Sequence, residues 1–184
     1  MTAMRLPPLD RDHMNDEQKR VYDIIASGPR GRVRGPLAVW LNRPELAETA
    51  QALGAYCRYG SSLEPRLSEL AILTMARLWS SEFEWWAHKP IALRAGLDPS
   101  IVEALRIGAV PSFDDSEAEI VYRVITTLNN DRTLGATLYD EALRILGKDR
   151  LVDLVGLAGY YTLISMTINA FGVELPDGEQ AELA

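Results

Sequence analysis

The chain has 184 residues, of which 47% are hydrophobic, and its formal net charge is -7. This length and apolar content predict one compact domain with a sizeable core, and the acidic balance disfavours binding to nucleic acid or to anionic lipid. No apolar stretch approaches the roughly 20 residues that a membrane span needs, and no signal-peptide pattern opens the chain. We therefore expect a cytoplasmic protein without a membrane partner.

The cysteine and histidine content excludes two kinds of site. Cys57 is the only cysteine, so the chain can form no internal disulfide and no dithiol redox pair. Only His13 and His88 are present, so a three-histidine metal site is impossible and we expect no metal. Cys57 lies on the apolar face of a predicted helix, which favours a packing role.

Helices are predicted throughout, in chain order. Asn15 is a helix cap, and Gly28-Pro29 ends the first helix. A loop to Pro36 follows, whose arginines Arg30, Arg32 and Arg34 we interpret first as part of a flexible segment and only second as an anion site. Later starts and stops are marked mainly by Pro44, Gly60, Pro65 and Gly96. The expected helices cover residues 16–27, 44–59, 65–79, 81–95, 99–107, 116–128, 133–146 and 148–171.

The predicted fold class is all-α, because no segment alternates apolar and polar residues with turn signals on both sides. We expect a single domain over 1–184, with an N-terminal arm and loop at 1–43, core helices at 44–172 and a short tail at 173–184. A faint repeat relates 66–71 (RLSELA) to 150–155 (RLVDLV), which indicates two similar helical halves. The second half has no histidine, so acid/base chemistry is expected in the first half.

Three titratable residues are the candidate catalytic group. Glu84 and His88 are four residues apart and share a helix face, and Glu69 lies on the preceding helix. Together they could accept or deliver a proton. Each has an ordinary structural alternative: Glu84 could complete a capping box with Ser81, and Glu69 could balance an arginine such as Arg77.

At this point the sequence resembles the carboxymuconolactone decarboxylase family and its AhpD-like alkylhydroperoxidase relatives over nearly its whole length. The resemblance rests on 28–46 (GPRGRVRGPLAVWLNRPEL), 66–72 (RLSELAI), 82–88 (EFEWWAH) and 159–171 (GYYTLISMTINAF). In the hydroperoxidases a glutamate is followed after twelve residues by a cysteine, after three more by a second cysteine and after four more by a histidine. In this sequence the same count from Glu69 reaches Ser81, Glu84 and His88.

The resemblance therefore implies an AhpD-like helical bundle and acid/base chemistry, because both thiols are replaced. It implies a cofactor-free decarboxylase that acts on a small lactone or organic acid of the kind met in aromatic catabolism, and a trimer or hexamer of identical subunits. Glu69, Glu84 and His88 are the catalytic candidates. Candidate substrate contacts are Ser81, Trp85 and the carboxylate anchors Arg77 and Arg58, although Ser81 is more typical of a helix cap, and Trp85, with Phe83 and Trp86, of a core or subunit contact.

Two other functions remain open from the sequence. The chain could be a non-catalytic binding protein that retains the fold, which would bind ligand without releasing a product. It could also be a peroxide reductase that works through Cys57 with a thiol from another molecule.

Overall fold

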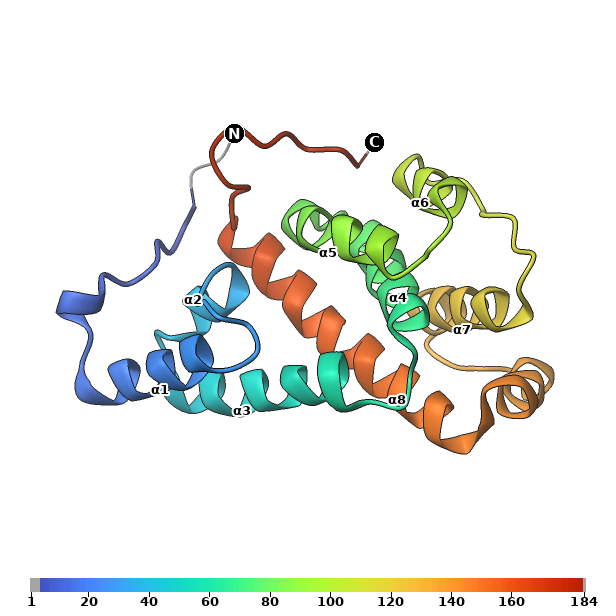
Figure 1. Cartoon of the computed structure of the whole chain (residues 1–184), viewed down its shortest axis with the longest axis horizontal. Helices are drawn as coiled ribbons and strands as arrows, with labels where there is room; N and C mark the ends of the chain where they lie inside the picture. The colour runs from blue at the N-terminus through green and yellow to red at the C-terminus, as the bar shows by residue number, and fades with distance from the viewer. Residues whose placement is uncertain (1–3, 184) are drawn as a thin grey trace.

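The computed structural model describes residues 4–183, and within this range the chain is helical with no strand, so the all-α prediction is confirmed. Figure 1 shows that α8 crosses the middle of the molecule, with α3 below it and α4 and α5 above it. The elements are η1 (Arg11–His13), α1 (Asp16–Ser27), α2 (Pro36–Trp40), α3 (Pro44–Ala55), η2 (Tyr56–Gly60), α4 (Pro65–Leu78), α5 (Glu82–Arg94), α6 (Pro99–Arg106), α7 (Ser116–Asp131) and α8 (Ala136–Phe171).

The N-terminal segment holds more structure than an arm and a loop. Asn15 caps α1 as predicted, and its carboxamide and that of Gln18 form a reciprocal capping box. The short helix α2 was not predicted from the sequence. All five of its residues are buried, and it packs against α3 and α8. A helix this short is held by tertiary packing, which leaves little periodic pattern in the sequence.

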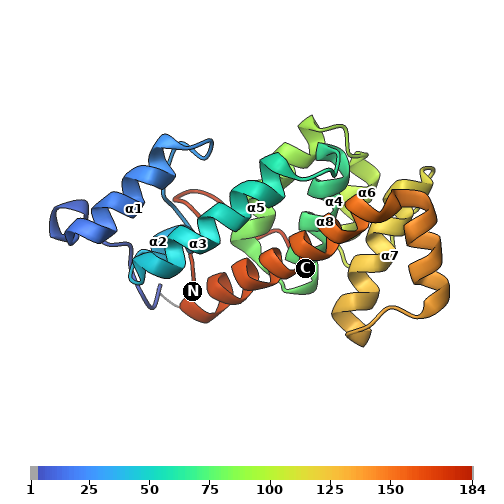
Figure 2. The ribbon, with the colours of Figure 1, turned by 90° about the horizontal axis from the view of Figure 1, so that it is seen from below.

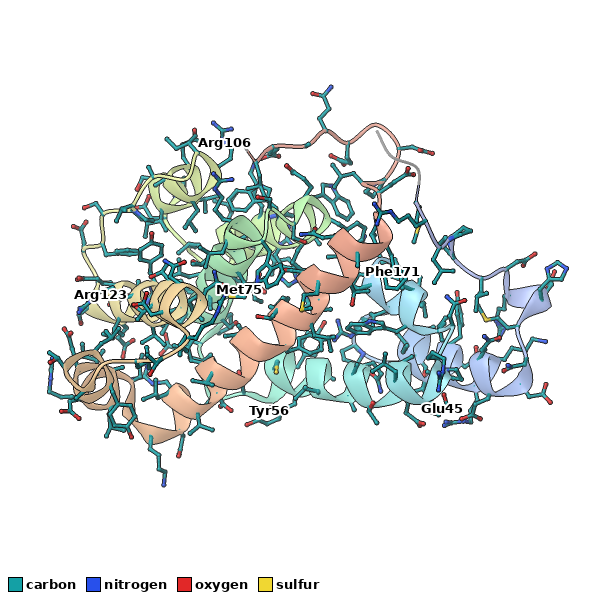
Figure 3. The ribbon with its side chains drawn as sticks, turned by 180° about the vertical axis from the view of Figure 1, so that it is seen from behind. Glu45, Tyr56, Met75, Arg106, Arg123 and Phe171 are labelled. Carbon is teal, nitrogen blue, oxygen red and sulfur yellow. The ribbon has the colours of Figure 1, made fainter. Side chains whose placement is uncertain are left out.

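Helix α4 forms the centre of the core. Its ten residues from Leu67 to Ala76 are all buried, because α5, α7 and α8 cover it. Figure 3 shows Met75 deep among the side chains of these helices, while Glu45 and Arg123 lie at the margins. Of the buried α4 residues, Ser68, Glu69 and Thr74 are polar, and only Glu69 is ionisable. A buried carboxyl in such a helix needs a partner, and it has one in α5.

The last helical segment, α8, consists of two helices that meet at a kink. The predicted division into helices 133–146 and 148–171 is confirmed, because Gly147 between them has a non-helical backbone with a φ of 73° and a ψ of 170°. A left-handed backbone of this kind favours glycine, which explains why the helix can turn there. Figure 2 shows the part after the kink running the length of the molecule, from α7 at one end towards α2 at the other.

Helix α8 is also long and apolar enough to cross a membrane, so the expectation that no stretch approaches that length was wrong. However, 61% of its apolar window is buried inside the protein. This burial is consistent with the core helix of a soluble protein, in which the apolar surface meets other helices.

The repeated motif occupies equivalent places in the two halves. Arg66 near the start of α4 pairs with Asp115 at 2.7 Å, and Arg150 just after the kink of α8 pairs with Glu117 at 2.8 Å. Both arginines therefore reach the start of α7. The acidic residues that follow them, Glu69 and Asp153, are both buried.

Candidate functional site

The three catalytic candidates form one buried cluster of close charged contacts. His88 Nδ1 lies 2.7 Å from Glu69 Oε2, and His88 Nε2 lies 2.9 Å from Glu84 Oε1. Each of the three residues is at most 5% exposed. The structure thus brings Glu69, His88 and Glu84 together in this order, and we call them the triad.

The structure also excludes the capping-box interpretation of Glu84. Helix α5 begins after Ser81, but no side-chain hydrogen bond caps it. The Glu84 carboxylate forms an ion pair with the imidazole of His88, one helical turn later, and does not accept from the backbone N–H of Ser81. The capping-box interpretation was therefore wrong, and the Ser81 hydroxyl is buried without a partner among the described residues.

The charge of His88 follows from its two neighbours. Burial acts to lower the pKa of the imidazole, but the carboxylates of Glu84 and Glu69 outweigh it, so the pKa lies above its usual value. An imidazole with a carboxylate at each nitrogen is best satisfied when both nitrogens carry hydrogen. The triad then holds an imidazolium between two carboxylates.

A cavity of about 250 Å³ opens beside the triad. Glu84 and His88 line it, whereas Glu69 does not and lies behind the imidazole. Helix α8 contributes Tyr160 and Tyr161 to the wall. The Tyr161 ring meets the imidazole edge-on at 87°, and its hydroxyl oxygen lies 3.4 Å from His88 Nε2.

Four arginines surround the same cavity: Arg30, Arg32 and Arg34 from the loop between α1 and α2, and Arg58 from the π-helical turn η2. Within residues 4–183, none of the four lies within 4.0 Å of a carboxylate. Burial and the charges of Arg32 and Arg58 lower the pKa of Arg34, an effect that Glu84 offsets in part. The loop thus brings three arginines to the cavity wall, an arrangement that the second interpretation of the sequence, an anion site, requires.

The three other substrate-contact candidates lie away from this cavity. Arg77 borders a separate hollow with Thr74 and Gly108. Trp85 is fully buried, and its indole N–H donates to Glu182 Oε2 at 3.3 Å. Ser81 is buried at the start of α5 and is absent from the cavity wall. Of the two proposed carboxylate anchors, only Arg58 lines the cavity.

Sequence reasoning missed Tyr160 and Tyr161, which lie more than 70 residues after His88. Both lie in the motif at 159–171, but the helical periodicity of this motif predicts only that they lie on an apolar helix face. Cys57 is buried and does not line the cavity, and burial raises the pKa of its thiol. Among the described residues there is no group of three or more histidine, cysteine or acidic side chains arranged to hold a metal ion.

Comparisons with known proteins agree with this description. Residues 44–122 match the model of the carboxymuconolactone decarboxylase family. A crystal structure of an uncharacterized peroxidase-related protein from Silicibacter sp. TM1040 has a TM-score of 0.74 at 16% identity, over 94% of this chain and 91% of that one. A second, described as an alkylhydroperoxidase AhpD core and an uncharacterized peroxidase-related protein from Ralstonia eutropha JMP134, has a TM-score of 0.75 at 12% identity, over 96% and 94% of the two chains.

At these identities the two structures show a shared fold and carry no function to this chain. Among curated proteins no sequence matches. The matched segment 44–122 contains the whole triad, and the chain has one cysteine where a redox pair would need two. Over the segment that carries its triad, the chain is therefore similar to the carboxymuconolactone decarboxylase family, and it lacks the paired cysteines of the alkylhydroperoxidases.

Proposed function

We propose that the protein is a cofactor-free acid/base enzyme that decarboxylates a small organic acid or lactone acid. One observation carries the proposal: a single cavity combines a buried proton-holding triad with four arginines that no described carboxylate neutralises. The triad provides the proton chemistry, and the arginines provide the binding of an acid. The similarity to the family supports this class of reaction without identifying the substrate.

The arginines favour a carboxylate ligand. Guanidinium groups bind carboxylates through two parallel hydrogen bonds, and they do so best where water is scarce. In this cavity Arg34 and Arg58 are half-buried. A bound anion would offset the two effects that lower the pKa of Arg34, which are first its burial and then the positive charges of Arg32 and Arg58. Arg30 adds a buried Nε with no partner among the described residues. Such a group is satisfied when a ligand oxygen reaches it.

The triad divides into a positioning residue and a reacting pair. Glu69 lies behind the imidazole and fixes the orientation of its ring, as an acid beyond the cavity wall can. Glu84 and His88 Nε2 face the cavity and lie 2.9 Å apart. This pair is placed to deliver a proton to a bound molecule and to recover it from solvent.

The reaction that fits these parts breaks one carbon–carbon bond. The substrate carboxylate leaves as carbon dioxide, and its bonding electrons move through a conjugated double bond onto a carbonyl oxygen. The resulting enolate then takes a proton from the pair of His88 and Glu84 at carbon, and the carbonyl reforms. The arginines hold the remaining acidic group, and the apolar wall of Phe83 and Ile164 limits water around the departing carboxylate.

A non-catalytic binding protein is the second candidate. It is favoured by the finding that both imidazole nitrogens already have carboxylate partners, so the triad could serve as a fixed charge cluster. A peroxide reductase working through Cys57 has less support, because that thiol is buried away from the cavity and its raised pKa disfavours the reactive thiolate.

The deciding experiment measures carbon dioxide release from a panel of lactone acids and β,γ-unsaturated or keto acids. We expect release with at least one of them, and a decrease in turnover of roughly a hundredfold or more in His88→Gln. His13→Gln is the matched control, since His13 is the only other histidine and is exposed in η1. Panel acids that raise the melting temperature but release no gas would identify a binding protein.

We also propose that the protein is cytoplasmic and assembles as a homo-oligomer. The buried apolar face of α8 agrees with a soluble protein, and the exposed apolar residues of the same helix provide a surface for contact between copies.

A further inference from the structure

The hydroxyl group of Tyr161 has a donor hydrogen that the described chain does not use. Its oxygen has one hydrogen-bond neighbour, His88 Nε2 at 3.4 Å. When both imidazole nitrogens carry hydrogen, Nε2 can only donate, so the tyrosine oxygen can only accept from it. The hydroxyl hydrogen must then find another acceptor, and the side chain is buried against the cavity with 1% of its surface exposed.

The surroundings of Tyr161 favour a donor over a base. Burial and the negative charge of Glu84 raise the pKa of Tyr161 well above its usual value, although Arg58 acts in the opposite direction. The phenol therefore keeps its proton across the neutral and alkaline range. The nearby positive charge of Arg58 would further favour an anion beside the hydroxyl.

We propose that Tyr161 donates the hydrogen bond that stabilises the oxyanion formed on the substrate, beside the pair of Glu84 and His88 that supplies the proton. This inference rests on the proposed function, because it places the substrate oxygen that receives the electrons in that reaction beside the Tyr161 wall of the cavity. A preorganised donor at such an oxygen acts on the charge that develops during the reaction, and it acts most strongly where water is excluded.

Tyr160 provides a matched control within the same helix. It is the neighbouring residue, lines the same cavity and is almost as deeply buried. Its hydroxyl accepts from Arg30 Nη2 at 3.4 Å, whereas the hydroxyl of Tyr161 contacts His88 Nε2. Tyr160→Phe and Tyr161→Phe thus remove the same atom from two different places.

Binding of two dyes to the purified full chain tests the inference without requiring turnover. The probe 4-hydroxy-3-nitrobenzoate carries a carboxylate for the arginines and an ionised phenol as the oxyanion, and 3-nitrobenzoate lacks the second group. We expect the wild type to bind the phenolate probe more tightly than 3-nitrobenzoate. In Tyr161→Phe this advantage should fall by roughly tenfold to a hundredfold, the value of one hydrogen bond to a charged group.

The ratio of the two affinities is the decisive quantity. Tyr160→Phe should change both affinities by a similar factor and leave the ratio near that of the wild type. An unchanged ratio in Tyr161→Phe, or a wild type that binds neither probe, would overturn the inference. Circular dichroism and the melting temperature verify that each variant is folded. A changed ratio together with no gas release from any acid would retain the oxyanion site and reject decarboxylation, so the two proposals fail separately.

Discussion

His88 has a carboxylate partner at each ring nitrogen, and this arrangement governs the charge at the centre of the molecule. A buried imidazole without such partners would lose its proton, because burial penalises the charged form. Here Glu69 and Glu84 outweigh that penalty and raise the pKa. The two acids together offset the free-energy cost of burying the charged imidazole. The three residues therefore act as a unit, and we expect the effects of substitutions within it on stability not to be additive.

The raised pKa of His88 predicts a specific dependence of stability on pH. The folded protein binds this proton more tightly than the unfolded chain, whose imidazole has a pKa of about 6.5. The stabilisation is therefore fully present below that pH and is lost as the pH rises through the folded-state pKa. We expect the free energy of unfolding of the wild type, relative to His88→Gln, to decrease from pH 6.5 upward.

Urea unfolding of both proteins at a series of pH values measures this difference. Subtracting the curve of the variant removes the contribution of every other titrating group that the two proteins share. A difference that stays constant above pH 6.5 would show that the imidazole is not held as a cation by its two acids.

At the scale of residues, the sequence predicts what is local. Glu84 and His88 could be paired because four residues along a helix return to the same face, and Glu69 because its helix is adjacent in the chain. Tyr161 and the arginine loop could not be placed, because they reach the cavity from elements distant in sequence. Ser81 and Glu84 show that a local pattern can be ambiguous, since their spacing fits both a capping box and a catalytic acid. Only the structure excludes the capping box, because it places the Glu84 carboxylate against His88 Nε2.

The turn η2 contributes Arg58 and Tyr59 to the cavity wall, and Gly54 of the preceding helix α3 permits the close approach of two other wall side chains. A Cβ at Gly54 would lie 2.1 Å from Tyr160 Oη and 2.4 Å from Arg30 Nη2. Asp153 of α8 holds both ends of η2 by accepting from the Tyr56 hydroxyl and from the backbone and hydroxyl of Ser62, each at 2.6 Å. The turn can therefore present Arg58 to the cavity while Tyr56 stays at the outer edge (Figure 3).

Gly54→Ala should destabilise the protein, although alanine is normally the better helix former by about 1 kcal/mol. The added methyl group must displace the Tyr160 hydroxyl or the Arg30 guanidinium, and overpacking of this kind costs about 1–3 kcal/mol. Affinity for 3-nitrobenzoate should fall as well, because Arg30 moves. Denaturant unfolding and dye titration measure the two effects.

Gly156→Ala is the control for this substitution. Gly156 also lies within a helix, but a Cβ there would meet no atom within 4 Å. Gly156→Ala should therefore leave the stability unchanged or raise it by about 0.5–1 kcal/mol, and the dye affinity should not change. If the two substitutions changed the stability and the dye affinity equally, the contact at Gly54 would not limit the size of the side chain at that position.

At the scale of elements, cap residues and glycines predict helix positions well and helix geometry poorly. Asn15 caps α1 and α6 begins at residue 99, both as the sequence indicates. The π-helical turn at Tyr56–Gly60 was hidden inside a longer predicted helix, because its causes are tertiary contacts to Asp153. A π-helical turn inserts an extra residue and rotates the side chains that follow, which is why such turns are often found at functional sites.

In the whole molecule, the two helical halves share an arginine anchor and differ in the contacts of their acids. Arg66 and Arg150 both anchor to the start of α7, and Glu69 and Asp153 follow each at the same spacing. Glu69 orients the imidazole, whereas Asp153 braces the turn that carries Arg58. Asp153, the acid of the second half, thus supports the same cavity indirectly, which agrees with the absence of histidine from that half.

The outer face of α8 predicts that the chain assembles with copies of itself. Exposed apolar residues recur there at helical spacing: Val152, Val155, Leu163 and Met166. A continuous apolar stripe of this kind on a soluble protein marks an interaction surface. The family resemblance implies a trimer or hexamer, so we expect light scattering after size exclusion to give a mass that is a multiple of 20.5 kDa.

Introducing a charge into this stripe should dissociate the assembly. Val155→Glu places a carboxylate where a partner helix would pack, and burying an unpaired charge costs far more than a surface contact provides. Val110→Glu is the control, because Val110 is 79% exposed in the loop between α6 and α7, away from the stripe. We expect Val155→Glu to elute as a monomer with an unchanged helical spectrum, and Val110→Glu to remain assembled. A wild type that is monomeric at tens of micromolar, or a Val155→Glu variant that stays assembled, would exclude this face of α8 as the contact.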